Sequence, residues 1–121
     1  MTLAELKHLW ASLIDDASHN TATEVNDFKA LRVEIHNATW CPDCEREVSE
    51  LLTLDAQAKQ GFDNITLYSY EDKADYKQRK AAAELPISCL PTLIFYRVDQ
   101  EVLCIKEDSA GQLSSLLQQL Q

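Results

Sequence analysis

The sequence predicts a single α/β domain, over residues 1–121, in which four strands are flanked by helices. Strand-like stretches, in which apolar and polar residues alternate, are interspersed along the chain with helix-like stretches, in which apolar residues recur at helical spacing. The paired cysteines Cys41 and Cys44 fall where a strand-like stretch gives way to a helix-like one. At 121 residues, 45% of them hydrophobic, the chain is long enough to bury one core.

The first predicted element is an N-terminal helix over about residues 3–17. Thr2, followed three positions later by Glu5, is a capping box, which marks a helix start. The apolar residues behind it recur at helical spacing: Leu3, Leu6, Leu9, Trp10, Leu13, Ile14 and Ala17. After a polar connection over residues 19–27, residues 31–35 alternate apolar and polar and predict a strand.

The second predicted helix begins at the cysteine pair. Pro42 suits the first helical position, where no backbone N–H is needed, and Gly61 is expected to end the helix. A strand is predicted over residues 65–70. A third helix is predicted from its cap Asp72 to about Glu84. The acidic residues of both helices are interpreted as solvated faces.

Residues 92–98 and 102–105 predict two strands joined by a hairpin turn. Ser109 with Gln112 is a second capping box, which predicts the start of a final helix. The apolar stripe of that helix consists of Leu113, Leu116, Leu117 and Leu120. The predicted order is therefore helix, strand, helix, strand, helix, two strands and helix.

The charge and hydropathy of the chain disfavour several classes of partner. With 20 acidic and 11 basic residues, the net charge of −9 leaves no basic stripe for nucleic acid or for an anionic membrane surface. No run approaches the roughly 20 apolar residues of a membrane-spanning helix. The start of the chain is amphipathic and does not read as a secretion signal. We expect a cytoplasmic monomer.

Two motifs together resemble the thioredoxin family. Residues 40–44 read Trp-Cys-Pro-Asp-Cys, and residues 90–92, directly before an apolar run, read Leu-Pro-Thr. The first motif is similar to that of the small cytosolic thioredoxin-related reductases. The resemblance covers the chain from about Phe28 onward. It implies a thioredoxin fold, with a central mixed four-stranded sheet, and a thiol–disulfide oxidoreductase that reduces protein or small-molecule disulfides.

Cys41 is the expected nucleophile of this reaction. Disulfide exchange needs a thiolate, which the N-terminus of a helix favours and the nearby carboxylates of Asp43 and Glu45 oppose. Cys44 follows three residues later on the same helix face and is expected to resolve the mixed disulfide that forms on Cys41. A reductase or a small dithiol must then return the pair to its reduced form.

The resemblance assigns roles to the residues around the two cysteines. It implies that Trp40 shapes the docking surface and that Leu90 offers its backbone to an extended substrate segment. It also implies that Pro91 is cis and limits approach to the sulfurs. Pro42 and Asp43 stand where thioredoxins have Gly-Pro, so they are expected to shape the site and change its substrate range.

The two remaining cysteines leave alternatives open. Cys89, close before the proline motif, is either an exposed secondary redox thiol or a small buried apolar side chain. Cys104 alternates with apolar neighbours in a strand and is expected in the core. In another interpretation Cys41 and Cys44 are half of a zinc site, but no second close pair completes it. We expect neither a metal nor another cofactor.

The chain departs from thioredoxins at positions that concern proton transfer and substrate choice. Thioredoxins carry a buried Asp six residues before the first cysteine, where this chain has Ile35. Glu34 is adjacent, but strand alternation aims it at the other face. Either a bulge brings Glu34 to the site or, as we favour, Cys44 loses its proton without a carboxylate. Lys106 stands near the position where thioredoxins have a glycine that lines the substrate groove, and it should narrow the substrate set and favour acidic partners. Two alternatives remain: a binding module with a structural or metal-bound cysteine pair, and a disulfide isomerase or oxidase.

Overall fold

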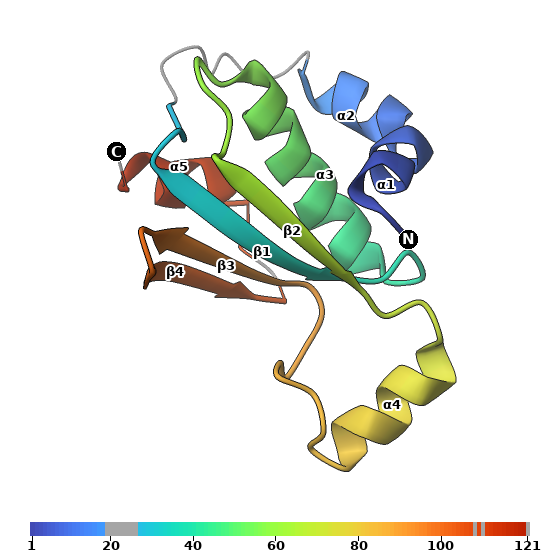
Figure 1. Ribbon diagram of the computed structural model, residues 1–121. Coiled ribbons are helices and arrows are strands. Elements are labelled where there is room, and N and C mark those ends of the chain that lie inside the picture. Colours follow the sequence, from blue (N-terminus) through green and yellow to red (C-terminus); the bar gives the residue numbers. More distant parts are fainter. Residues whose placement is uncertain (19–26, 108, 110, 121) are drawn as a thin grey trace.

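The computed structural model describes residues 1–18, 27–107, 109 and 111–120 (Figure 1). The predicted connection over residues 19–27 lies outside this range except for its last residue. The elements in chain order are α1 (Leu3–Leu9), α2 (Ala11–Ser18), β1 (Leu31–Asn37), α3 (Pro42–Gln57), β2 (Asn64–Ser69), α4 (Lys73–Ala81), β3 (Thr92–Arg97), β4 (Gln100–Lys106) and α5 (Leu113–Gln118). None of the helices in the described ranges is both long and apolar enough to cross a membrane.

The four strands form one mixed sheet in the order β2-β1-β3-β4. Strand β1 pairs parallel with β2 and antiparallel with β3, and β3 pairs antiparallel with β4 through a tight hairpin. A parallel pair needs a crossover connection, which α3 supplies between β1 and β2. The predicted mixed four-stranded sheet with flanking helices is therefore confirmed.

The core lies between one face of the sheet and helices α3 and α5. Strand residues with odd numbers in β1 and β3 point toward these helices, since side chains alternate along a strand. The buried residues at the centre are Leu31, Val33, Ile35, Leu93 and Phe95 from the sheet, with Val48, Leu51, Leu113 and Leu117 from the helices. Helices α1 and α2 pack beyond α3 and not on the sheet (Figure 1).

Helix α4 stands apart from the other helices and projects beyond the end of the sheet (Figure 1). Only Tyr76 of this helix is buried, and most of its remaining residues are charged or polar. A helix without an apolar stripe has nothing to bury against a sheet. The second sheet face therefore carries polar contacts, in which Tyr96 donates to Glu34 at 3.1 Å and Arg32 lies 4.1 Å above the Tyr96 ring.

The predicted N-terminal helix is interrupted at Trp10, which ends α1. The capping box at its start is confirmed, because Glu5 N donates to Thr2 Oγ1 at 3.2 Å and Thr2 N donates to Glu5 Oε1 at 2.9 Å. The interruption keeps Leu6 and Trp10 in the core and leaves Leu9 53% exposed. The prediction of a single continuous helix over residues 3–17 was therefore wrong.

Two predicted helix ends are also corrected. Helix α3 ends at Gln57, before Gly61. Gly61 instead allows the backbone to pass close to the Asp55 side chain, because a Cβ at this position would lie 2.6 Å from Asp55 Oδ1. That oxygen accepts the Phe62 N–H at 2.8 Å. Helix α4 begins after its predicted cap Asp72 but ends at Ala81. The predicted capping box before α5 is absent, because Gln112 caps that helix without a side-chain bond.

Candidate active site

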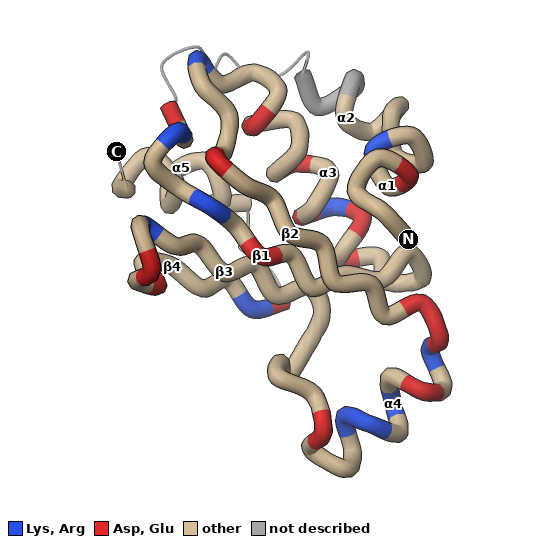
Figure 2. The backbone as a smooth tube through the Cα atoms, in the orientation of Figure 1, with Lys and Arg blue, Asp and Glu red and all other residues tan. Residues whose placement is uncertain are grey.

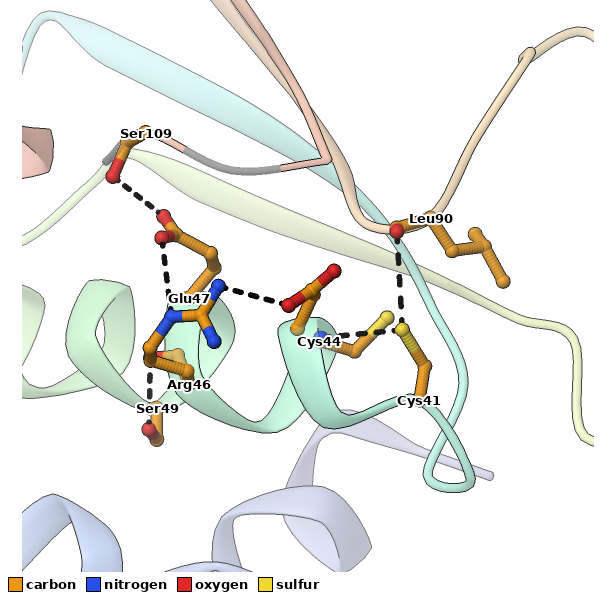
Figure 3. A network of polar contacts seen from close by, with 8 residues as sticks. Cys41, Cys44, Arg46, Glu47, Ser49, Leu90 and Ser109 are labelled. Carbon is orange, nitrogen blue, oxygen red and sulfur yellow. Dashed lines mark hydrogen bonds and ion pairs between the residues drawn. The ribbon is translucent and has the colours of Figure 1, made fainter. Parts of the chain in front are cut away.

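The two paired cysteines lie at the junction between β1 and α3, as predicted (Figure 3). Cys41 is the N-cap residue of α3, and its Sγ accepts a hydrogen bond from Cys44 N at 3.4 Å. Pro42 follows as the first helical residue. Both cysteines are free thiols. The sulfur of Cys41 thus faces the unpaired N–H groups and the positive end of the helix dipole.

The Leu90-Pro91-Thr92 motif places the loop before β3 against the sulfur of Cys41. The Leu90–Pro91 peptide bond is cis, and the Cys41 thiol donates to the Leu90 carbonyl across 3.8 Å. Cys41 is 8% exposed, whereas Cys44 is fully buried. A disulfide arriving from solvent therefore meets Cys41 first.

Burial raises the pKa of the Cys44 thiol well above its ordinary value, and its hydrogen bond with Cys41 acts in the same direction. The Ala38 backbone N–H opposes this by stabilising the thiolate, and the charge of Asp43 adds to the increase. Cys44 therefore stays protonated at neutral pH. This difference in exposure separates the two cysteines into an outer and an inner thiol.

Comparison with known proteins identifies the fold. No family model and no curated protein matches the sequence. Among solved structures, thioredoxin f2 of Chlamydomonas reinhardtii is 20% identical over 86% of this chain and 92% of that one, with a TM-score of 0.53. The chain has the thioredoxin fold. This confirms the predicted resemblance to thioredoxin-like proteins.

Two further structures carry the same fold. Trxlp from Edwardsiella tarda EIB202 is 25% identical over 90% of this chain and 91% of that one, with a TM-score of 0.50. Thioredoxin O1 from Arabidopsis thaliana, in its oxidized state, is 21% identical over 87% of this chain and 86% of that one, also with a TM-score of 0.50.

The buried carboxylate expected in a thioredoxin is replaced by an aliphatic side chain. Ile35 is fully buried on the α3 side of the sheet. Glu34 lies on the opposite face, where it accepts from Tyr96 and pairs with Arg32 at 3.7 Å. The register of β1 runs without a bulge, so alternation holds and Glu34 points away from Cys44.

Asn37, which lies beyond the predicted strand over residues 31–35, is the last residue of β1 and was missed as a site residue. It lies on the same face as Ile35 and is fully buried. In the described part of the chain, neither its side-chain oxygen nor its nitrogen has a hydrogen-bond partner. The sequence signal that could have identified Asn37 is a polar residue at the end of a buried strand.

An aromatic cluster borders the dithiol of this thioredoxin fold. Trp40 donates from Nε1 to the Tyr70 carbonyl at 2.9 Å, and its ring lies 5.6 Å from that of Tyr76. The Tyr70 hydroxyl lies 2.9 Å from His36 Nδ1. Lys73 sits 5.4 Å above the Trp40 ring. Only Trp40 was predicted here, because Tyr70, just after β2, and Lys73 and Tyr76 of α4 come from a distant part of the sequence.

A polar network runs from the dithiol helix to the loop before α5 (Figure 3). Asp43 pairs with Arg46 at 2.9 Å, Arg46 Nε lies 3.9 Å from Glu47, and Ser109 donates to Glu47 at 2.8 Å. Glu47 is only 1% exposed. The interpretation of every acidic residue of this helix as solvated was therefore wrong for Glu47.

The other two cysteines lie near the proline motif. Cys89 is half-buried with its Sγ 3.9 Å from Thr92 Oγ1, so it is neither fully exposed nor fully buried. Cys104 is also half-buried, which corrects the prediction that it lies in the core, and burial raises its pKa. Within the described ranges, no three His, Cys, Asp or Glu side chains gather as a metal site.

Proposed function

We propose that the chain is a thiol–disulfide oxidoreductase that reduces disulfides of proteins or small molecules by dithiol exchange. The observation that carries this proposal is the pairing of an outer and an inner thiol in a thioredoxin fold. Cys41 lies at the N-terminus of α3 and is 8% exposed, and Cys44 is fully buried beneath it. The cis Leu90–Pro91 segment borders the outer sulfur at 3.8 Å.

The reaction proceeds in two exchanges. The Cys41 thiolate attacks one sulfur of the substrate disulfide, forms a mixed disulfide and releases the first substrate thiolate, which takes up a proton. Cys44 then loses its proton and attacks Cys41 Sγ, and the second substrate thiolate leaves. Two electrons have passed to the substrate, and Cys41 and Cys44 end as a disulfide.

The neighbouring residues serve substrate docking in this proposal. Leu90 supplies a backbone edge for an extended substrate segment, and Pro91 limits the approach to the sulfurs. Trp40, fixed by its bond to the Tyr70 carbonyl, forms one wall. The Asp43 carboxylate, paired with Arg46, borders the dithiol and adds to the raised pKa of Cys44.

Turnover requires an external source of two electrons, a reductase or a small dithiol, because the substrate oxidises the pair once per cycle. Four cysteines that are not arranged as a disulfide framework suit a reducing compartment, so we propose that the protein acts in the cytoplasm. We also propose that it is a monomer. Its partners are then disulfide-containing substrates and this recycling reductant.

The reduction potential of the pair tests the proposal. The protein, with Cys89 and Cys104 changed to Ser, is equilibrated in graded dithiol buffers and its free thiols are counted. A two-electron transition near the thioredoxin value of about −270 mV supports a reductase. A value of about −180 to −120 mV indicates an isomerase or oxidase. The absence of a reversible transition leaves a binding module with a structural cysteine pair.

Two variants test the order of attack. Cys41→Ser should abolish turnover of a generic disulfide, whereas Cys44→Ser should accumulate mixed disulfides with substrate. Full multiple-turnover activity of Cys44→Ser is incompatible with the dithiol mechanism. Metal analysis of protein purified without chelator tests the structural-metal alternative directly.

A further inference from the structure

A cavity of about 710 Å³ opens beside the proline motif, on the sheet face opposite α3 and α5. Its walls are the end of α4, the segment that follows α4 and the outward side chains of β3 and β4. Leu85, Ile87 and Ile94 form its apolar part. Cavities of roughly 300–1,000 Å³ with an apolar lining and a few polar groups are typical of binding sites.

The cavity begins close to the attacking sulfur. Cys41 Sγ contacts the Leu90 carbonyl at 3.8 Å, and Thr92, two residues further along, already lines the cavity. Lys106 is the strand partner of Thr92 and lines it as well. An extended peptide rises about 3.3 Å per residue, so a substrate cysteine at Cys41 places residues two to four positions away at this cavity.

The end of the cavity near the dithiol is cationic. Lys106 stands on the sheet side and Lys80 on the helix side, where its Nζ lies 5.9 Å from the Tyr76 ring. In the parts of the chain that the structure describes, no carboxylate lies within ion-pair distance of either lysine. Figure 2 shows that basic residues alternate with acidic ones along α4.

The carboxylate that lines the cavity lies at its other end. Glu101 is five residues before Lys106 on β4, roughly 16 Å away along an extended strand. The cavity is therefore polarised, with positive charge toward the dithiol, although the net charge of the chain is −9.

We propose that this cavity is a second docking site for the substrate and selects polypeptides with Asp or Glu two to four residues from the reactive cysteine. The acidic side chain lies between Lys80 and Lys106, and an apolar neighbour packs against Ile87 and Ile94. This inference rests on the proposed oxidoreductase function and names its substrate class: acidic, extended disulfide-containing segments.

Matched peptides test the selection. Two disulfide peptides are compared that differ only in Glu or Lys three residues from the cysteine, together with the small uncharged substrate bis(2-hydroxyethyl) disulfide. The wild-type protein should prefer the Glu peptide by about tenfold in kcat/KM, as expected for two partly exposed charge pairs. Lys80→Glu and Lys106→Glu should each reduce this preference, and the double variant should reverse it, with the turnover of the small disulfide by each variant as the reference for changes at the dithiol itself.

Lys77→Glu is the matched control, because it makes the same charge change at an exposed position of α4 that does not line the cavity. It should leave the preference intact. Equal kcat/KM for both peptides in the wild-type protein, or an equal loss of preference in Lys77→Glu, would overturn the proposal.

A binding measurement separates this proposal from the proposed function. Fluorescence anisotropy is recorded for labelled linear Glu and Lys peptides, with serine in place of cysteine, on the full-length protein. Tighter binding of the Glu peptide, lost in the Lys80→Glu Lys106→Glu variant, supports docking even if no disulfide is turned over. Turnover of every disulfide without a binding preference supports the oxidoreductase and rejects this docking site.

Discussion

The hydroxyl of Ser109 donates a 2.8 Å hydrogen bond to the carboxylate of Glu47 and so joins the loop before α5 to α3 (Figure 3). Glu47 is 1% exposed, and a carboxylate out of contact with water depends on hydrogen bonds and opposite charge. Arg46 supplies part of that charge at 3.9 Å. The bond also explains why Ser109 does not cap α5: its hydroxyl is engaged elsewhere.

Ser109→Ala should lower the free energy of unfolding by about 1–3 kcal/mol, because it withdraws a donor from a buried charged acceptor. Urea unfolding of the reduced protein at pH 7 measures this. Ser115→Ala, at an exposed position of α5, is the matched control and should change stability by less than about 0.5 kcal/mol. Equal effects of the two substitutions would show that the bond to Glu47 contributes nothing.

Resolution of the mixed disulfide should accelerate with pH. The pKa of Cys44 is raised by burial, so its thiolate fraction at neutral pH is small and grows about tenfold per pH unit. Stopped-flow reaction with a chromogenic aromatic disulfide separates the two thiol releases, and the second should speed up about tenfold per unit between pH 7 and 9. Asp43→Asn should make this phase faster at each pH, because the Asp43 charge contributes to the raised pKa. A second phase independent of pH would contradict this assignment.

The sheet and the start of the dithiol helix could be predicted because they depend on local patterns. Alternation marks β1, and Pro42 after a cysteine cap marks the start of α3. The burial of Glu47 could not be predicted, because its partner Ser109 is 62 residues away and a lone Glu on a helix is usually solvated.

The position of α4 could not be predicted from local sequence patterns either. Its cap follows from sequence, but its separation from the sheet depends on the absence of any apolar stripe to bury. That separation leaves Cys104 half-buried on a cavity wall, where the strand pattern alone predicts a core residue. The exposure of the sheet face near the dithiol therefore depends on the whole fold and not on the local sequence.

Acid should destabilise the protein through His36. This side chain is 5% exposed, it lies 2.9 Å from the Tyr70 hydroxyl, and its ring stacks at 4.7 Å on Tyr68. Burial lowers the pKa of His36, and the nearby Glu34 carboxylate opposes this only in part. A folded-state pKa below the ordinary value of 6.5 means that the unfolded chain binds the proton more readily. Stability from this group is therefore present above about pH 6.5 and is lost as pH falls.

Urea unfolding midpoints between pH 7.5 and 5.5 measure this loss, and His36→Phe should flatten the pH dependence by up to about 1.4 kcal/mol per unit. His8→Gln is the control, because His8 is exposed on α1, and it should keep the wild-type slope. An unchanged slope in His36→Phe would assign the acid sensitivity to the carboxylates.

Asn37→Leu should leave the stability of the protein unchanged or raise it by about 1 kcal/mol. Asn37 is fully buried and its side-chain amide has no partner in the described part of the chain, so its desolvation is uncompensated. Leu has a similar branched shape and removes the polar atoms. Asn37→Asp should instead destabilise the fold at pH 7, because it places an unpaired charge at the same buried position. Urea unfolding of both variants distinguishes them, and a loss of several kcal/mol in Asn37→Leu would mean that the native amide is satisfied by bound water.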